Sequence, residues 1–285
     1  MTATPTRPQV ATVDERSAGL VEAFLTTPVG GGDAIDATLA HQSLLDALDR
    51  GEHHRLMAWP ATSPRAVAHL SASGTLSVAG EAAAGPAIAE HVAASGWRVL
   101  LGDAALGDAI LEAASRGLLR RRARAREQRL MVVREPADLA PPVGLRLAVP
   151  ADRAAVTDLA CRLHVEDRMG PPLSRAAREG VSERMRDSIA RGATWVVDRG
   201  AVVAKVDVSL ASPRRGAQIA GVYVEEAYRG GGLATRAVAA VVRELVTRWG
   251  LPGVTLHVRA DNEPGRRAYA RAGFLDRGAW TLALR

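Results

Sequence analysis

The sequence predicts an α/β protein with a mixed sheet, divided into two domains. Its 285 residues are about twice the length of an ordinary domain. Apolar patterns typical of strands alternate with patterns typical of helices along most of the chain. Residues 135–143, EPADLAPPV, contain Pro141 and Pro142, which continue neither a helix nor a central strand. We therefore expect one domain over residues 1–140 and a second over residues 141–285.

The first half shows an α/β alternation with uneven spacing. Its patterns predict strands and helices in the order strand 75–78, helix 84–95, strand 97–101, helix 108–115 and strand 130–134. Earlier in the chain, Gly30, Gly31 and Gly32 precede Asp33 and a helix-like run. No strand clearly comes before these glycines and no basic residue accompanies them, so a flexible turn is favoured over a phosphate-binding loop.

The second half gives a clearer series of elements. Its patterns predict, in order, strand 144–149, helix 150–164, helix 175–191, strands 194–197, 201–209 and 217–224, a long helix from Leu233, strand 254–259, helix 264–272 and strand 280–284. The order β-α-α-β-β-β-α-β-α-β does not repeat a simple βαβ unit. It predicts a mixed sheet with helices packed on its faces.

The composition indicates a globular protein of a reducing, aqueous compartment. Hydrophobic residues make up 47% and charged residues 24%. No stretch approaches the roughly 20 apolar residues of a membrane span, and the first residues lack the apolar run of a signal peptide. The single cysteine, Cys161, excludes an internal disulfide and lies in an apolar helical pattern that favours burial. We expect a cytoplasmic location.

The positive charge of the chain is almost entirely arginine. The net charge is +6, and Lys205 is the only lysine. Such a balance favours anionic partners without selecting one. Seven arginines fall in one stretch: Arg116, Arg120, Arg121, Arg122, Arg124, Arg126 and Arg129. They are interpreted as a solvated helix end or as a dock for an acidic partner. Nucleic acid is not expected, because no aromatic residue interleaves with them.

A glycine-rich loop between a predicted strand and a predicted helix is the strongest local signal. Backbone amides at a helix N-terminus favour a bound anion, and glycine lets phosphate oxygens approach the main chain. The loop therefore predicts a phosphate-binding site. Its residues are Arg229, Gly230, Gly231, Gly232, Leu233, Ala234 and Thr235.

This loop and its surroundings resemble the GNAT superfamily of N-acyltransferases. The family's phosphate loop reads Arg/Gln-x-x-Gly-x-Gly/Ala, which Arg229, Gly232 and Ala234 match. The strand before it reads GVYV at residues 221–224. Downstream follow an Asn, a helical Tyr and a Gly-Phe pair, as in the family: Asn262, Tyr269, Gly273 and Phe274. The resemblance covers residues 143–285 and implies the GNAT acyl-CoA N-acyltransferase fold.

The first half resembles, more weakly, the GNAT-like domain that precedes the catalytic domain in two-domain proteins of this superfamily. The stretch that carries this likeness is residues 126–133, REQRLMVV, and it continues through the linker to residues 145–147. No Arg-x-x-Gly-x-Gly/Ala loop occurs before Val143. The resemblance therefore implies tandem GNAT-like domains, of which the first is degenerate and serves acceptor or partner binding.

The resemblance implies a role for each matching residue. Backbone groups of Val222, Tyr223 and Val224 would pair with the pantetheine arm as with an added strand. The amides of residues 230–235 would hold the pyrophosphate. Asn262 would bond the pantetheine or cap a helix, and both can hold together. Tyr269 would protonate the departing thiolate, or else be a buried helix aromatic.

Several residues are candidates for the base that receives the amine proton. His257 stands five residues before Asn262, where several amine acetyltransferases of the family carry a glutamate. Its ordinary pKa of about 6.5 suits the task, although a strand histidine facing outward fits the pattern equally well. Glu166, Asp167 and Asp207 are rivals that would act through water.

The implied function is an acyltransferase of class EC 2.3.1. It would transfer an acetyl or other acyl group from acyl-CoA, as co-substrate, to a primary amine by direct attack in a ternary complex, without a metal. The acceptor would be a small-molecule or peptide amine. Three alternatives stay open. An acidic acyl carrier protein could present the acyl group, the domain could be a non-catalytic acyl-CoA sensor, or the first half could recruit a partner.

Overall fold

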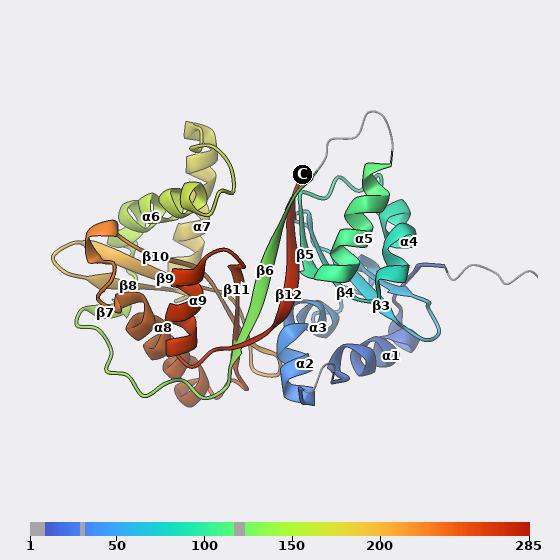
Figure 1. The fold of residues 1–285 in the computed structure, drawn as a ribbon, viewed down its shortest axis with the longest axis horizontal. Helices are drawn as coiled ribbons and strands as arrows, with labels where there is room; N and C mark the ends of the chain where they lie inside the picture. The colour runs from blue at the N-terminus through green and yellow to red at the C-terminus, as the bar shows by residue number, and fades with distance from the viewer. Residues whose placement is uncertain (1–8, 29–31, 117–122) are drawn as a thin grey trace, which may run out of the picture. The chain divides into compact units, whose positions relative to one another are not determined.

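The computed structural model describes residues 9–28, 32–116 and 123–285. The chain forms two compact units, one of Met1–Arg129 with Gly278–Arg285 and one of Leu130–Arg277 (Figure 1). The boundaries fall within two long strands, β6 (Arg124–Val133) and β12 (Leu275–Leu284). The compact units thus divide inside strands and not at the proline-rich linker. The roles expected of residues 1–140 and 141–285 stay predictions.

The first unit is a sheet with helices on both faces. Its strands lie in the order β1 (Ala11–Thr12), β2 (Leu56–Trp59), β3 (Ala66–Leu70), β4 (Thr75–Gly80), β5 (Val99–Asp103), β12. Its helices are α1 (Glu15–Thr26), α2 (Ala34–Ala40), α3 (Gln42–Asp49), α4 (Gly85–His91) and α5 (Ala104–Ser115). Val78 packs with α4 and α5, whereas its neighbour Ala79 packs with α1 and α3. Since adjacent strand residues point to opposite faces, the helices cover both.

The α/β alternation predicted for the first half is confirmed, and its earliest elements were missed. The predicted strand 75–78 corresponds to β4, and the helix 108–115 begins four residues earlier, at Ala104. The helix 84–95 ends sooner, at His91. Asp33 caps α2, where its carboxylate accepts a hydrogen bond of 2.8 Å from the Asp36 amide. Gly30 and Gly31, taken as a flexible turn, lie outside the described residues.

The second half of the chain confirms the predicted order of elements. They are β7 (Leu145–Leu147), α6 (Arg153–Glu166), α7 (Arg175–Ala190), β8 (Thr194–Asp198), β9 (Val202–Ser212), β10 (Gly216–Val224), α8 (Leu233–Arg243), β11 (Val254–Arg259), α9 (Glu263–Arg271) and β12. The sheet order is β6-β11-β10-β9-β8-β7. Among the described strand pairs of this unit, β10 and β11 are parallel. The pairs β7–β8, β8–β9 and β9–β10 are antiparallel. The sheet is therefore mixed, as expected.

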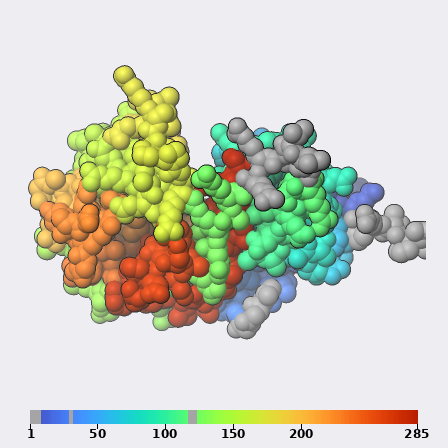
Figure 2. Space-filling view, turned by 45° about the horizontal axis from the view of Figure 1, so that its top comes forward, coloured from blue at the N-terminus to red at the C-terminus, as the bar shows by residue number. Residues whose placement is uncertain are grey.

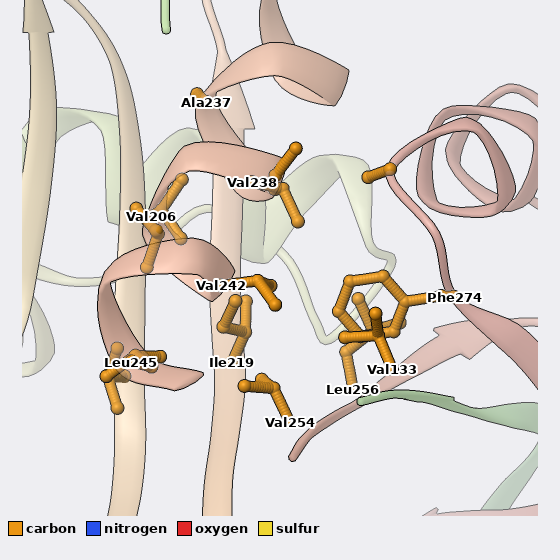
Figure 3. Close-up of a cluster of buried hydrophobic side chains, with 14 of the residues drawn as sticks. Val133, Val206, Ile219, Ala237, Val238, Val242, Leu245, Val254, Leu256 and Phe274 are labelled. Carbon is orange, nitrogen blue, oxygen red and sulfur yellow. The ribbon is translucent and has the colours of Figure 1, made fainter. Parts of the chain in front are cut away.

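Two hydrophobic cores lie on opposite faces of this sheet. Val196 packs with α6 and α7, whereas the next residue, Val197, belongs to the core beneath α8. In Figure 3, Val242 of α8 points toward Ile219 of the sheet, and Val238 belongs to the same core. On the other face the start of α7 is exposed, and the residues around it, coloured yellow, stand out from the surface (Figure 2). No helix in the described ranges is long and apolar enough to cross a bilayer.

The parallel strands β10 and β11 pair over only part of their lengths. Paired residues run from Ala217 with Val254 to Ile219 with Leu256. Yet β10 continues to Val224 and β11 to Arg259. On its other edge β10 carries a register shift against β9 between Ala220 and Tyr223. The carboxyl-terminal halves of β10 and β11 therefore form a fork, a name used below for residues 220–224 and 257–259.

Candidate functional site

The glycine loop leads from the fork into α8 through two left-handed residues. Gly230 has φ +83° and Gly232, the N-cap of α8, has φ +72°. The Arg236 amide donates to the Gly232 carbonyl at 3.1 Å, so the helical ladder begins there. The amides of residues 233–235 precede it and have no carbonyl four residues back within the helix. A Cβ built on Gly230, Gly231 or Gly232 would meet no atom within 4 Å. The loop is thus open to a ligand of phosphate size.

Thr235 adds a side-chain donor to this loop. It lies in the first turn of α8 and is 5% exposed. Its Oγ1 is buried and has no hydrogen-bond partner among the described residues. A buried hydroxyl without a partner is unfavourable by about 1–3 kcal/mol, and a phosphate oxygen would satisfy it. The sequence predicted a role in phosphate binding only for the backbone amide of Thr235, and not for its side chain. The residues present therefore fit a bound diphosphate.

Arg229 ties the loop to the fork and to α6. Its Nε donates to the Val224 carbonyl at 2.8 Å, and its Nη2 lies 2.9 and 3.1 Å from the two carboxylate oxygens of Glu166. Its guanidinium also lies over the Tyr223 ring, 5.2 Å from the centroid. The Tyr223 hydroxyl donates to Glu166 at 2.7 Å. Glu166 thus accepts from two side chains and anchors the loop. Its part as a base stays a prediction.

Arg259, at the end of β11, completes this network and was missed by the sequence reasoning. Its Nη1 donates to the main-chain carbonyl of Glu166 at 2.9 Å, and its Nε donates to Asp261 at 2.8 Å. Glu166, the last residue of α6, therefore contacts the β10 arm of the fork through its side chain and the β11 arm through its backbone. No motif marks Arg259, because its partner is 93 residues away in the sequence.

Tyr269 and Asn262 lie on or beside α9. Tyr269 is partly buried and packs edge-on against Phe274, with ring centroids 6.1 Å apart. Burial, and after it the negative charge of Asp167, raises the pKa of the Tyr269 hydroxyl well above its ordinary value. The hydroxyl is therefore protonated at neutral pH, as a proton donor must be. Asn262 caps α9, and its Oδ1 accepts from the Gly265 amide at 3.0 Å. Its bond to a pantetheine stays a prediction.

His257 occupies the first position of β11 beyond the last residue paired with β10. Its Nδ1 lies 2.9 Å from the side-chain nitrogen of Gln218. Burial lowers the pKa of the imidazole to about 4, so the ring is neutral at pH 7. A neutral ring can accept a proton from an amine, but with this pKa it would pass that proton on and not retain it.

Two other sequence-predicted features, Cys161 and the arginine stretch, have described contacts of their own. Cys161 is partly buried against the core of α6 and α7, and burial raises the pKa of its thiol. In the arginine stretch, Arg116 pairs with Glu112 at 2.8 Å. Arg120, Arg121 and Arg122 lie outside the described residues. Within the described ranges, no group of three or more His, Cys, Asp or Glu is placed to hold a metal ion.

Comparisons with known proteins show which family and which fold this chain is similar to. Residues 161–274 match the model of the acetyltransferase (GNAT) family. A GCN5-related N-acetyltransferase from Sphaerobacter thermophilus has 18% identity and a TM-score of 0.58, with 98% of this chain and 96% of that chain covered. A GNAT-family acetyltransferase from Colwellia psychrerythraea has 12% identity, a TM-score of 0.54 and coverage of 97% and 98%.

A Drosophila protein is similar at 14% identity, with a TM-score of 0.59 and coverage of 97% and 98%. No curated protein matches the sequence. At these identities the solved structures show the fold. They cover nearly the whole chain, which is compatible with a GNAT-like first half.

The lowered pKa of the partly buried His257 predicts a pH dependence of folding. The unfolded ring has its ordinary pKa near 6.5 and the folded ring about 4, so the unfolded state binds more protons between these values. The free energy of unfolding should therefore fall as the pH is lowered from about 6.5 to 4, by up to about 3 kcal/mol. His257→Gln should remove this part of the dependence in urea titrations. His54→Gln, at an exposed histidine, should retain it. Equal slopes in the two variants would contradict the assignment.

Proposed function

We propose that the chain, whose residues 161–274 match the model of the acetyltransferase (GNAT) family, transfers an acyl group from acyl-coenzyme A to a primary amine. The observation that carries the proposal is the open loop at residues 230–235, placed directly beyond the fork. A diphosphate on this loop would leave a pantetheine arm able to extend along the strand arms. The amine and the thioester would then react directly, within a ternary complex.

The loop supplies hydrogen-bond donors and left-handed turns suited to two phosphates. The first-turn amides of α8 and the Thr235 hydroxyl donate, and the helix dipole favours the negative charge. The guanidinium of Arg229 donates hydrogen bonds to the Val224 carbonyl and to Glu166, so this side chain fixes the conformation of the loop. Affinity for the cofactor thus rests mainly on the backbone and Thr235.

The fork supplies the main-chain groups for the thioester end. Beyond Ile219 the edge of β10 that faces β11 has no paired strand residue in the described register. Backbone groups of Val222, Tyr223 and Val224 can pair with the pantetheine amides as a third strand would. A main-chain N–H of this stretch would also donate to the thioester carbonyl oxygen as negative charge develops there, a contribution of about 3 kcal/mol for single donors.

Proton transfer completes the reaction. The amine nitrogen bonds to the carbonyl carbon, the carbon–sulfur bond breaks, and the thiolate takes the proton of Tyr269. The amine proton leaves through His257 or through a water held by a carboxylate. Among the carboxylates, Glu166 already accepts from Tyr223 and Arg229, whereas Asp167 lies close enough to Tyr269 to influence its pKa.

The first half also contains a pair of parallel strands, β4 and β5, but these two strands stay paired and do not separate into a fork. In β4 and β5, four consecutive residues pair, from Thr75 with Val99 to Val78 with Gly102. A Cβ on Gly102 would lie 2.0 Å from the Val78 carbonyl oxygen, so these strands approach closely. Beyond them the Gly80 amide donates to the Asp103 carboxylate at 2.7 Å. We propose that this half binds no cofactor and serves the acceptor or a partner.

The proposed function is tested by measuring thiol release from acetyl-CoA with a panel of primary amines, together with calorimetry of coenzyme A binding. Turnover with free acetyl-CoA supports the proposal as stated. Turnover that occurs only when the acyl group is loaded on a carrier protein would identify the acyl carrier protein, and not acyl-CoA, as the donor. Tight coenzyme A binding without transfer to any amine identifies a sensor. Neither binding nor transfer would overturn all three.

The closed strands of the first half predict the binding stoichiometry. Calorimetry of the full chain with coenzyme A should give one site per chain, because among the described residues only the second half combines an open fork with a glycine loop at the start of a helix. A stoichiometry of two would contradict the degenerate assignment of residues 1–140.

The glycine loop predicts a specific loss of affinity. Gly232→Val places a branched side chain where a phosphate must approach, so coenzyme A affinity should fall by at least about 100-fold. Gly200→Val is the matched control. Gly200 also has a positive φ, +87°, and an open Cβ position, but it lies in the β8–β9 turn. Calorimetry should show near-normal affinity for it. Equal losses would indicate backbone strain as the cause.

Removal of the Tyr269 hydroxyl should affect turnover and not binding. A general acid contributes about 100- to 10,000-fold, so Tyr269→Phe should lower kcat by about that factor while coenzyme A affinity changes little. The ring itself, and its contact with Phe274, is retained. Tyr228→Phe, at an exposed tyrosine, should leave kcat unchanged. Normal turnover of Tyr269→Phe would remove this residue from the mechanism.

A further inference from the structure

The only lysine of the chain is buried beside the fork. Lys205, on β9, is 1% exposed. Its Nζ donates to the carboxylate of Asp207 and, at 2.8 Å, to the main-chain carbonyl of Gly221. Asp207 also accepts from the Thr194 hydroxyl at 3.1 Å. A buried ion pair is often no more stabilising than apolar residues of similar volume. Stability alone therefore does not account for a lysine here.

The carbonyl that Lys205 contacts belongs to a β-bulge at the base of the fork. Ala220 pairs with Asp207, and the next pair joins Tyr223 to Lys205. Gly221 and Val222 of β10 therefore lie opposite one residue of β9, so β10 has one extra residue here. Gly221 has φ +64°. A Cβ there would lie 2.5 Å from the Asp207 carboxylate and 2.9 Å from Lys205 Nζ. The bulge therefore requires glycine and encloses the ion pair tightly.

The contact also sets the direction of an amide. In a trans peptide the C=O and the following N–H point to opposite sides. Lys205 holds the carbonyl of the Gly221–Val222 peptide, so the Val222 N–H points away from Lys205. A cation on the carbonyl also polarises the peptide and makes its N–H a stronger donor. The peptide lies where β10 has just separated from β11.

We propose that Lys205 is a positioning residue for acyl transfer. Its ammonium group fixes and polarises the Gly221–Val222 peptide, so that the Val222 N–H donates to the thioester carbonyl oxygen. This inference rests on the proposed function. It selects the Val222 N–H as the donor among the main-chain N–H groups of Val222, Tyr223 and Val224. Asp207, in this account, only balances the charge of Lys205.

The test separates the two partners of Lys205. The double variant Lys205→Met/Asp207→Asn contains no unpaired buried charge. If Lys205 only neutralises Asp207, this variant should turn over like the wild type. If it acts on the Gly221 carbonyl, kcat should fall about 10-fold or more, while coenzyme A affinity and the KM for acetyl-CoA stay within about 2-fold. The control Thr194→Val removes another hydrogen bond to Asp207 and keeps Lys205 on the Gly221 carbonyl, so its kcat should stay within about 3-fold of the wild type.

A wild-type kcat in the folded double variant would overturn the proposal. Parallel losses of kcat, coenzyme A affinity and urea stability would also overturn it, since they indicate a purely structural role. Should the wild type itself neither bind coenzyme A nor transfer an acyl group, the proposed function fails first.

A measurement on the wild type covers the case in which the variants do not fold. In protein labelled with ¹⁵N-valine, a ketone analogue of acetyl-CoA should shift the Val222 amide proton downfield relative to coenzyme A alone. An unchanged Val222 signal, with the analogue bound, would exclude this amide as the donor.

Discussion

The second unit depends on the early separation of two parallel strands. Backbone N–H and C=O groups that leave a ladder need other partners, because burying them unpaired costs free energy. After Ile219 and Leu256, the backbone N–H and C=O groups of β10 and β11 are no longer paired with one another in the described register. On one side of β10 the ladder is interrupted by a bulge, and in the proposed function the pantetheine arm would pair with the other side. The glycine loop begins at Arg229, five residues after Val224, so one ligand could extend from the fork to the loop in the proposed function.

Charged groups hold this opening in place, together with the apolar packing of Val224 and Val258. Glu166 joins the loop through Arg229, and its backbone carbonyl joins β11 through Arg259. Lys205 fills the bulge from β9. Directional bonds of this kind fix positions at an edge that must remain accessible, which an apolar contact would tend to close. Charge-assisted hydrogen bonds are also among the stronger ones. The first half shows the alternative, in which Gly102 lets the strands close.

The sequence was sufficient where the signal was local. The order of the second half, the loop at residues 229–235 and the cap of Asn262 follow from periodicity, glycine and side-chain chemistry within a few residues. Helices α1 to α3 and strands β2 and β3 were missed. The ion pairs of Arg259 and the burial of Lys205 could not be predicted, since their partners come from separate elements. His257 was chosen for its ordinary pKa, which burial lowers to about 4.

The central claim is that coenzyme A lies on the glycine loop and along the fork. Hydrogen–deuterium exchange of the full chain, with and without coenzyme A, tests it at the level of backbone amides. We expect slower exchange in peptides covering residues 222–224 and 230–236, with no change at residues 75–103. Binding that leaves residues 222–236 unchanged, or that protects residues 75–103 in their place, would contradict the account.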